Sequence, residues 1–377
     1  MLHHDTILEI ASHFDLGGTP VAVKELTAGN INITYRLDMG AEADAPRYVL
    51  QRINTGAFRD PDSLMENVRR VTAHIRAGLE TEGVDTERRV LHFVTAENGT
   101  LLYTAPAGTA GEGAWRAYRY VDDVTAYDRI EHPSTLYEAG RGFGEFQTRL
   151  ADFPAEVLSE TIPHFHDTPY RYDTFCRSVE ADRAGRAAEV TEEIAFINSR
   201  RELMRSIVDR LATGELPLRV THNDTKVNNV LIDNQTGRAL CVIDLDTVMP
   251  GSSLYDYGDA VRFGACTAAE DEEDLSKIDF DMTLFEAFTR GFVEMTATNL
   301  TRDELLLLPL GALVLTCELA MRFLTDYLDG DVYFKTRCPA HNLVRTRAQM
   351  QLLCKMEEKY DAMCAFVASL VDGGDAS

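Results

Sequence analysis

Apolar residues along the chain repeat with two different periods. In the first third they alternate with polar residues in short runs separated by turn signals, a pattern typical of β-strands. The expected strands are residues 21–26, 31–37, 47–53, 90–94, 101–105 and 114–121. From residue 134 onward apolar residues recur every three or four positions, as in amphipathic helices. The pattern therefore predicts an α+β chain, with a small antiparallel β-sheet lobe over residues 1–121 and a larger, mainly helical lobe over 122–377.

Most of the expected helices lie in the second part of the chain. Two come earlier, at residues 5–14 and 60–79. The later ones are residues 136–150, 172–187, 191–211, 281–295, 303–328 (with a restart at Pro309) and 342–371. Gly140, Gly142 and Gly144 interrupt the first of these, and such small residues indicate close packing against another helix. Residues 250–258 are rich in Pro, Gly and Ser and are expected to form a loop.

The most informative stretch lies between residues 221 and 247. His222, Asp224 and Asn229 have the spacing H-x-D-x-x-x-x-N, and residues 216–220 before them are expected to form a strand that delivers this loop. In kinase catalytic loops the aspartate orients the acceptor hydroxyl and can accept its proton, and the asparagine binds Mg²⁺. The spacing therefore indicates Asp224 as a catalytic base and Asn229 as a metal ligand. The alternative is a polar surface turn that contains these residues by chance.

The residues after this loop predict a second metal ligand. Apolar runs at 230–232 and 239–243 are separated by Asp233-Asn-Gln-Thr-Gly237, a hairpin signal. Such a hairpin would return the chain so that Asp244 lies beside Asn229. One asparagine and one aspartate are the kind of oxygen ligands that Mg²⁺ takes from a protein, so Asn229 and Asp244 together predict a magnesium site.

The first three strands suggest how a nucleotide would bind. The turn that contains Gly29 and Asn30, followed by Asn32, lies between the first two strands, where backbone amides can cover phosphates. The third strand carries Gln51 and Arg52 where kinases carry a phosphate-binding lysine. Neighbouring strand residues face opposite sides, so only one of them can reach the phosphates. Gln51 is the residue at the matching position, and we expect Arg52 to be this cation if the strand register is shifted slightly; the alternative is that Arg52 faces solvent.

Further candidates lie at the hinge, on the second helix and in one loop. Tyr120 and Val121 end the last strand of the small lobe, where backbone groups would contact adenine. Glu66 could pair with a phosphate-binding cation, but we expect it on a solvated helix face. Residues 164–171 hold two histidines and an aspartate at poor metal-binding spacing, so we expect a structural or substrate-side loop. Arg322 stands among apolar residues and needs a polar partner, either Asp326 or a substrate oxygen.

Composition limits the classes of partner. Lys and Arg number 37 and Asp and Glu number 61, giving a formal charge of −24, which argues against nucleic-acid binding. No long apolar run indicates a membrane helix, and the N-terminal residues do not resemble a secretory signal. Seven cysteines without a C-x-x-C pair indicate reduced thiols in a cytoplasmic protein, which we expect to be a monomer. In so acidic a chain a nucleotide site must recruit metal and local basic groups.

These features lie in long strings that carry a family resemblance. The chain resembles the bacterial N-acetylhexosamine 1-kinases, within the aminoglycoside phosphotransferase and choline kinase group of small-molecule kinases. The similarity covers nearly the whole chain and is strongest in GNINITYRL, YVLQRIN, IPHFHDTPYRY, LRVTHNDTKVNNVLID, VIDLDTVMPGSSLYDYGDAVRFGA and MRFLTDYLDGDVYF. It implies a two-lobed protein-kinase-like fold and transfer of the ATP γ-phosphoryl group to the anomeric hydroxyl of N-acetylglucosamine or N-acetylgalactosamine.

The resemblance also implies roles for particular residues. Asp224 matches the catalytic base, and Asn229 and Asp244 match the Mg²⁺ ligands. The sugar contacts match Arg322 and Tyr333, and the pocket wall matches Phe263. The family commonly has histidine at the position of Asn30, near the sugar, so this difference bears on substrate preference.

Two groups of alternatives stay open. The acceptor could be another small alcohol: choline, ethanolamine, homoserine, methylthioribose or an aminoglycoside. A non-catalytic nucleotide-binding scaffold is a further alternative, against which the complete set of Asp224, Asn229 and Asp244 argues.

Overall fold

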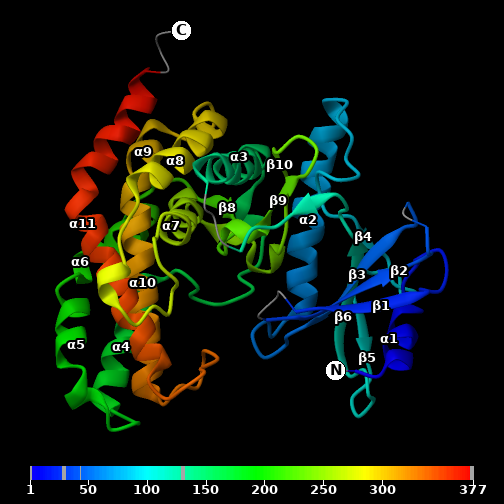
Figure 1. Cartoon of the computed structure of the whole chain (residues 1–377), viewed down its shortest axis with the longest axis horizontal. Coiled ribbons are helices and arrows are strands. Elements are labelled where there is room, and N and C mark those ends of the chain that lie inside the picture. The colour runs from blue at the N-terminus through cyan, green and yellow to red at the C-terminus, as the bar shows by residue number, and fades with distance from the viewer. Residues whose placement is uncertain (1, 28–30, 43, 129–131, 374–377) are drawn as a thin grey trace.

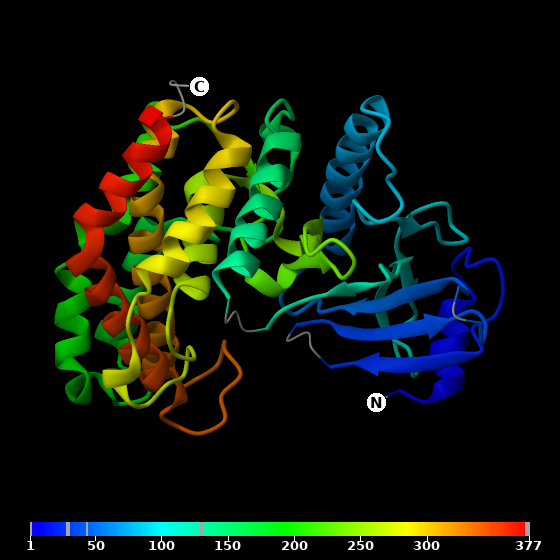
Figure 2. The same cartoon turned by 45° about the horizontal axis from the view of Figure 1, so that its top comes forward.

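The chain folds into two lobes. The computed structural model describes residues 2–27, 31–42, 44–128 and 132–373. A β-sheet with two flanking helices forms one lobe, and a larger set of helices forms the other (Figures 1 and 2). This is the mixed architecture with an antiparallel sheet that the hydrophobic pattern predicts, and Gly29 and Asn30 lie outside the described residues.

The small lobe is built on a six-stranded antiparallel sheet. Its strand order is β1-β2-β3-β6-β4, and β5 also pairs with β6. The strands are β1 Ala22–Leu26, β2 Ile33–Asp38, β3 Arg47–Ile53, β4 Phe93–Val94, β5 Tyr103–Ala105 and β6 Gly113–Arg119. Helix α1 (His4–Ala11) packs its apolar residues on one face of the sheet, around the buried Trp115, which is 0% exposed. Helix α2 (Pro61–Thr81) shares a core with segments of the helical lobe and so joins the two lobes.

Short strands continue into the helical lobe. Strand β7 (Val124–Thr125) already pairs with β9 (Val230–Asp233), so the chain leaves the first sheet between residues 119 and 124. Strand β9 pairs antiparallel with β10 (Ala239–Val242), which confirms the predicted hairpin. Gly237 closes the turn with a φ of 68°, a value that glycine adopts without strain. Strand β8 (Arg219–Thr221) pairs with β11 (Met249–Gly251).

Helices form the rest of the large lobe. They are α3 Pro133–Arg149, α4 Thr168–Ala181, α5 Thr191–Asn198, α6 Arg201–Thr213, α7 Ser253–Gly264, α8 Met282–Thr296, α9 Arg302–Leu306, α10 Leu308–Asp329 and α11 His341–Gly373. The predicted restart at Pro309 is confirmed, because α9 ends and α10 begins just before it. The predicted close packing of α3 is also confirmed: a Cβ added at Gly140 would lie 2.2 Å from the Phe288 carbonyl oxygen of α8.

Two expectations about helices were wrong. The single helix expected over residues 191–211 is broken into α5 and α6. The loop expected over residues 250–258 is largely helix α7, which begins after Ser252, whose hydroxyl caps the Leu254 N–H. Gly258 signalled a turn in the sequence, but here it lets α7 approach α10, since a Cβ would lie 2.4 Å from the Gly311 carbonyl oxygen.

Helix α10 is the central helix of the large lobe. By length and composition alone it is the one candidate membrane span among the described residues, but 78% of its apolar window is buried within the protein. It packs against α7, α4 and α11, which accounts for its apolar character. All seven cysteines are free thiols.

Candidate active site

The loop with the H-x-D-x-x-x-x-N spacing follows β8, and hydrogen bonds to a side chain of helix α7 hold its backbone in place. The buried carboxylate of Asp256 accepts the backbone N–H groups of His222 and Asn223 at 2.9 and 2.8 Å, and the side-chain amide of Gln147 at 2.5 Å. Burial raises the pKa of Asp256, and these donors oppose that shift. Asn223 has a φ of 64° and directly precedes Asp224, so Asp256 holds a constrained backbone next to the candidate base.

His222 ties this loop to the end of β10. The backbone N–H of Asp224 donates to its Nδ1 at 3.3 Å, so Nδ1 is an acceptor and the ring proton lies on Nε2. Nε2 donates in turn to the Ile243 carbonyl at 2.8 Å. The histidine is fully buried between Phe143 and Phe146, and it therefore acts as a structural link rather than as a proton carrier.

Asp224 faces a cationic neighbour. The Lys226 ammonium lies 2.9 Å from Asp224 Oδ1, and this carboxylate raises the pKa of Lys226, which stays charged. Asn229 donates from Nδ2 to the Asp224 carbonyl at 2.8 Å, which leaves its Oδ1 as the atom that can coordinate a cation. The three side chains line the same cavity.

The hairpin brings Asp244 to this cavity. The Ile243 N–H donates to the Asn229 carbonyl at 2.9 Å, so Asp244 follows directly beside Asn229. Desolvation between the lobes, with the charges of Asp246 and Asp224, raises the pKa of Asp244 to about 7, although its side chain is open to the cavity. Crowded carboxylates of this kind call for a cation. One carboxylate and one amide oxygen fit Mg²⁺, which takes few protein ligands and completes its shell with water and phosphate oxygens.

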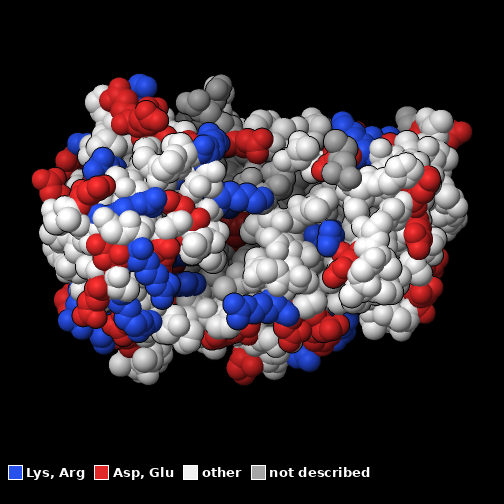
Figure 3. Space-filling view, turned by 90° about the horizontal axis from the view of Figure 1, so that it is seen from below, with Lys and Arg blue, Asp and Glu red and all other residues white. Residues whose placement is uncertain are grey.

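The cavity lies between the two lobes and measures about 310 Å³. The predicted nucleotide contacts Asn32, Gln51, Tyr120 and Val121 all line it. Arg52 does not, and the expectation that it is the phosphate-facing cation was wrong: its guanidinium lies against Gly113 on the opposite face of β3. Seen from below, the surface is hollowed between the helical part and the sheet, and Lys and Arg side chains border the hollow (Figure 3).

The cation on the cavity side of the sheet is Arg116 of β6. It is 3% exposed and lines the cavity. Its Nη1 lies 2.5 Å from Asp246 Oδ1, and its Nε and Nη2 donate to Gln51 Oε1 at 2.9 and 2.6 Å. Asn32 donates to the other oxygen of Asp246 at 2.7 Å, which links the small lobe to the hairpin segment.

Of the two partners expected for Arg322, the structure excludes Asp326 and pairs the arginine with another carboxylate. Its Nη1 lies 3.4 Å from Glu318, one turn earlier on α10. Asp326 is not available, because its carboxylate accepts the backbone N–H groups of residues 332–334 at 2.7–2.9 Å. The Arg322 guanidinium lies over three rings, those of Phe165, Tyr333 and Phe334.

Residues 164–171 contribute to the same cluster; the loop expected there ends at Asp167, and the later residues are the first turn of α4. His166 Nδ1 lies 3.0 Å from the buried Glu318. Arg171 donates to the Phe165 carbonyl at 3.3 Å and makes no ion pair within the described residues; burial and the nearby Arg322 lower its pKa. No group of three or more His, Cys, Asp or Glu residues among the described ones is arranged to hold a metal.

This cluster is continuous with the catalytic loop through Asp259. Asp259 Oδ2 accepts the backbone N–H of Thr225 at 3.1 Å. Burial alone would raise its pKa, but Arg262 and Lys226 hold it below the usual value, and His166 is close enough to act in the same direction. Asp259 thus lies between the catalytic loop and the residues around Glu318, while Arg322 itself does not line the cavity between the lobes.

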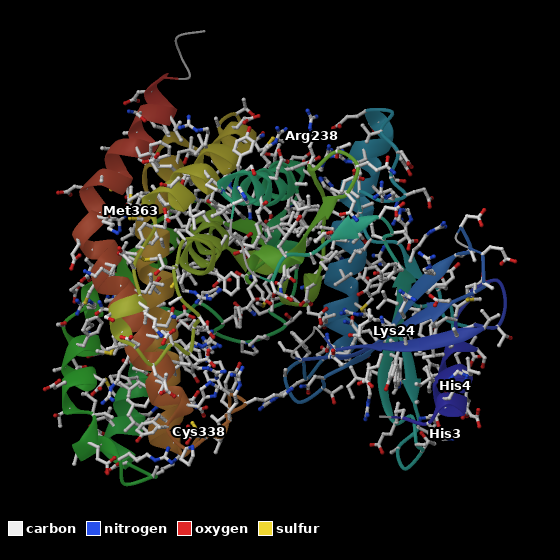
Figure 4. The ribbon with its side chains drawn as sticks, in the orientation of Figure 1. His3, His4, Lys24, Arg238, Cys338 and Met363 are labelled. Atoms are coloured by element: carbon white, nitrogen blue, oxygen red, sulfur yellow. The ribbon has the colours of Figure 1, made fainter. Side chains whose placement is uncertain are left out.

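The remaining expected acceptor contacts lie at different depths. Tyr333 is 62% exposed on the loop between α10 and α11, the loop whose later residue Cys338 is labelled at the lower end of the helical lobe (Figure 4). Phe263 is partly buried against the helical core and does not line the cavity between the lobes.

Sequence reasoning missed several residues of this site, and two left a signal. Lys226 stands two residues after Asp224 within the recognised motif. Arg116 is a charge between Trp115 and Ala117, the same apolar context that singled out Arg322. Asp256 left no signal, because its role depends on how α7 packs under the loop.

Comparison with known proteins agrees with this geometry. A model of the phosphotransferase enzyme family matches residues 22–287, from β1 through the catalytic loop and into α8. The chain belongs to the phosphotransferase enzyme family. This phosphotransferase shares its fold with solved kinases of low sequence identity.

Three of these structures illustrate the similarity. A microcompartment-associated aminopropanol kinase matches with a TM-score of 0.62 and 15% identity, covering 96% of this chain and 98% of the other. An amicoumacin kinase in complex with AMP-PNP, Ca²⁺ and amicoumacin matches with a TM-score of 0.57 and 13% identity, covering 92% and 93%. A choline kinase from Cryptosporidium parvum matches with a TM-score of 0.55 and 13% identity, covering 98% and 99%.

Proposed function

We propose that this phosphotransferase transfers the γ-phosphoryl group of ATP to the anomeric hydroxyl of an N-acetylhexosamine. Membership of the phosphotransferase family supports the reaction class. The arrangement of Asp224, Asn229 and Asp244 around one cavity supports a metal-dependent kinase mechanism. A similar structure that holds AMP-PNP and Ca²⁺ supports a nucleotide and a divalent cation as ligands.

In this mechanism Asp224 positions the acceptor hydroxyl and accepts its proton. The Lys226 ammonium, 2.9 Å from Asp224 Oδ1, helps to hold the carboxylate in place, and the proton is transferred to Asp224 late in phosphoryl transfer. Lys226 also presents a positive charge where the transferred group would pass. Mg²⁺ bound at Asn229 and Asp244 would neutralise charge on the phosphate oxygens.

The observation that carries the choice of acceptor is the charge around Glu318. Arg322 pairs with this single buried carboxylate and His166 contacts it, while Arg171 lies near Arg322 and Glu318 without an ion pair of its own within the described residues. The cluster therefore has a surplus of hydrogen-bond donors and of positive charge. Such a site favours an acceptor rich in oxygen atoms, such as a sugar with an acetamido group.

The same cluster argues against an amine as acceptor. A cationic substrate would meet like charge from Arg171 and Arg322. Choline recognition relies on aromatic rings around the ammonium, and here the rings of Phe165, Tyr333 and Phe334 already surround the Arg322 guanidinium. Choline, ethanolamine and aminoglycosides are therefore the less favoured acceptors.

An ATP-consumption assay over a panel of acceptors tests the proposal. The panel holds N-acetylglucosamine, N-acetylgalactosamine, glucose, galactose, methylthioribose, homoserine, choline, ethanolamine and an aminoglycoside. We expect the N-acetylhexosamines to give the highest kcat/KM, with a sugar 1-phosphate as product. If an amine-containing acceptor gave a higher kcat/KM than the N-acetylhexosamines, the proposed acceptor would be wrong. No turnover with any compound would favour a non-catalytic scaffold.

Arg322→Lys tests the acetamido contact directly. Lysine keeps the charge but loses the planar set of donors, so the preference for N-acetylglucosamine over glucose should shrink by about tenfold while the melting temperature stays near wild type. Arg183→Lys is the matched control, because Arg183 is 71% exposed. An unchanged preference together with a lower melting temperature would assign Arg322 a structural role only.

A further inference from the structure

The charges that line the nucleotide cavity raise a question that the proposed function leaves open. Its acidic lining residues are Asp128, Asp224 and Asp244, and its basic ones within the described residues are Arg116 and Lys226. ATP would add several negative charges to this set. Lys226 is engaged with Asp224 at the acceptor end, so Arg116 is the basic residue on the side of the sheet.

The register of the sheet brings Arg116 to the place of a lysine on β3. Thr34, Gln51 and Arg116 are direct neighbours across β2, β3 and β6, so their side chains share the face that lines the cavity. Gln51 occupies the position where kinases carry a phosphate-binding lysine. Its Nε2 donates to Thr34 at 3.0 Å, which turns its Oε1 toward the two N–H groups of Arg116.

The counter-ion of this arginine also comes from an unusual element. In kinases a glutamate on the helix next to the sheet pairs with the lysine. Here Glu66 on α2 pairs with Arg69 and Arg70 instead, and their hydrogen bonds lower its pKa to about 2. The acidic partner of Arg116 is Asp246, two residues after the candidate metal ligand Asp244, and both members of the pair are at most 4% exposed.

We propose that Arg116 is the cation that binds the phosphate groups of the nucleotide, and that Gln51 and Asp246 position it. The proposal rests on the proposed ATP-dependent function. A guanidinium has five N–H donors. Nε and one N–H of Nη2 donate to Gln51, and Nη1 contacts Asp246 and, at 3.7 Å, Met65 Sδ, so the second N–H of Nη2 is left for a phosphate oxygen. The phosphate-binding charge would therefore lie on β6, directly beside the position on β3 where kinases carry their lysine.

A purely structural role makes a different prediction. If Arg116 only neutralises Asp246, its loss should weaken the fold and the binding of every ligand of the cavity. If it binds phosphates, its loss should weaken binding of ligands that carry phosphates and spare those that lack them.

Isothermal titration calorimetry without any acceptor separates these roles. The probes are AMP-PNP with Mg²⁺, and adenosine. For Arg116→Gln we expect about ten- to a hundredfold weaker binding of AMP-PNP, as for the loss of one or two charge-assisted hydrogen bonds, and unchanged binding of adenosine. Arg119→Gln is the matched control, since Arg119 lies on the same strand and is 48% exposed.

A relocated charge provides the second arm. The double variant Gln51→Lys/Arg116→Gln places the cation on β3, and it should regain most of the affinity for AMP-PNP. Equal loss of AMP-PNP and adenosine in Arg116→Gln, or wild-type affinity for AMP-PNP, would overturn the assignment. A wild-type protein that binds neither probe would overturn the proposed function itself, and this result is distinct because it does not depend on the variants.

Discussion

Replacing Asp256 by asparagine should impair catalysis, although Asp256 does not line the cavity where the substrates would bind. The carboxylate lies under the catalytic loop, is 1% exposed and does not line the cavity. One of its oxygens accepts the N–H of His222 and the amide of Gln147, and the other accepts the N–H of Asn223. An asparagine amide has one oxygen, so it can satisfy only one of these two sets.

In the better orientation of the asparagine amide, its oxygen accepts the hydrogen bonds from His222 and Gln147. Its NH₂ group then faces the Asn223 N–H, which loses its acceptor. A buried donor left without a partner costs about 1–3 kcal/mol, and the retained hydrogen bonds weaken because their acceptor is no longer charged. Removal of a carboxylate whose pKa is raised by burial offsets part of this loss. We therefore expect Asp256→Asn to lower the free energy of unfolding by about 2–3 kcal/mol.

The larger effect should fall on kcat. Asn223 directly precedes Asp224, and a shift of about 1 Å at a positioned group can cost up to about a hundredfold in rate. We expect kcat to fall about ten- to a hundredfold while KM for ATP stays near wild type. Steady-state kinetics and a melting curve check this, with the exposed Asp173→Asn as control. Wild-type kcat in a protein with wild-type melting temperature would refute the reasoning.

Three further predictions concern the groups that line the cavity. Asp224→Asn should fold normally and lose about 10²- to 10⁴-fold in kcat, and a variant that keeps more than about a tenth of wild-type kcat would remove Asp224 from the role of base. Asn229→Ala and Asp244→Ala should each need far more Mg²⁺ for half-maximal rate, and titrations that overlay wild type would contradict the metal assignment. Lys226→Met should lower kcat more than it raises KM for ATP, because Lys226 contacts Asp224 at 2.9 Å. An unchanged rate of phosphoryl transfer in pre-steady-state measurements would exclude a role of Lys226 in the chemical step.

Local patterns in the sequence determined most elements of the fold. Strand β3 has the bounds that alternation predicts, residues 47–53, because alternating burial on a sheet leaves a direct record in the sequence. The catalytic hairpin was also predictable, since Asp233 to Gly237 supply turn chemistry between two apolar runs. Helix α7 was missed because Gly258, which permits close packing against α10, has the same appearance in a sequence as a turn glycine.

Part of the site could likewise be predicted. Asp224 and Asn229 are close in the chain, so their spacing alone places them in one loop, and the hairpin adds Asp244. The choice between Gln51 and Arg52 could not be made correctly, because the expected cation assumed a register shift that the sheet does not have.

Tertiary structure decided the partners of the charged residues. Asp326, one helical turn after Arg322, was the carboxylate expected from the sequence. The structure pairs Arg322 with Glu318, one turn before it, because Asp326 accepts three backbone N–H groups of the next loop. Arg116 and Gln51 meet across 65 residues of sequence. Such contacts depend on strand register and on the packing of one lobe against the other, and neither quantity is encoded in the residues next to the contact itself.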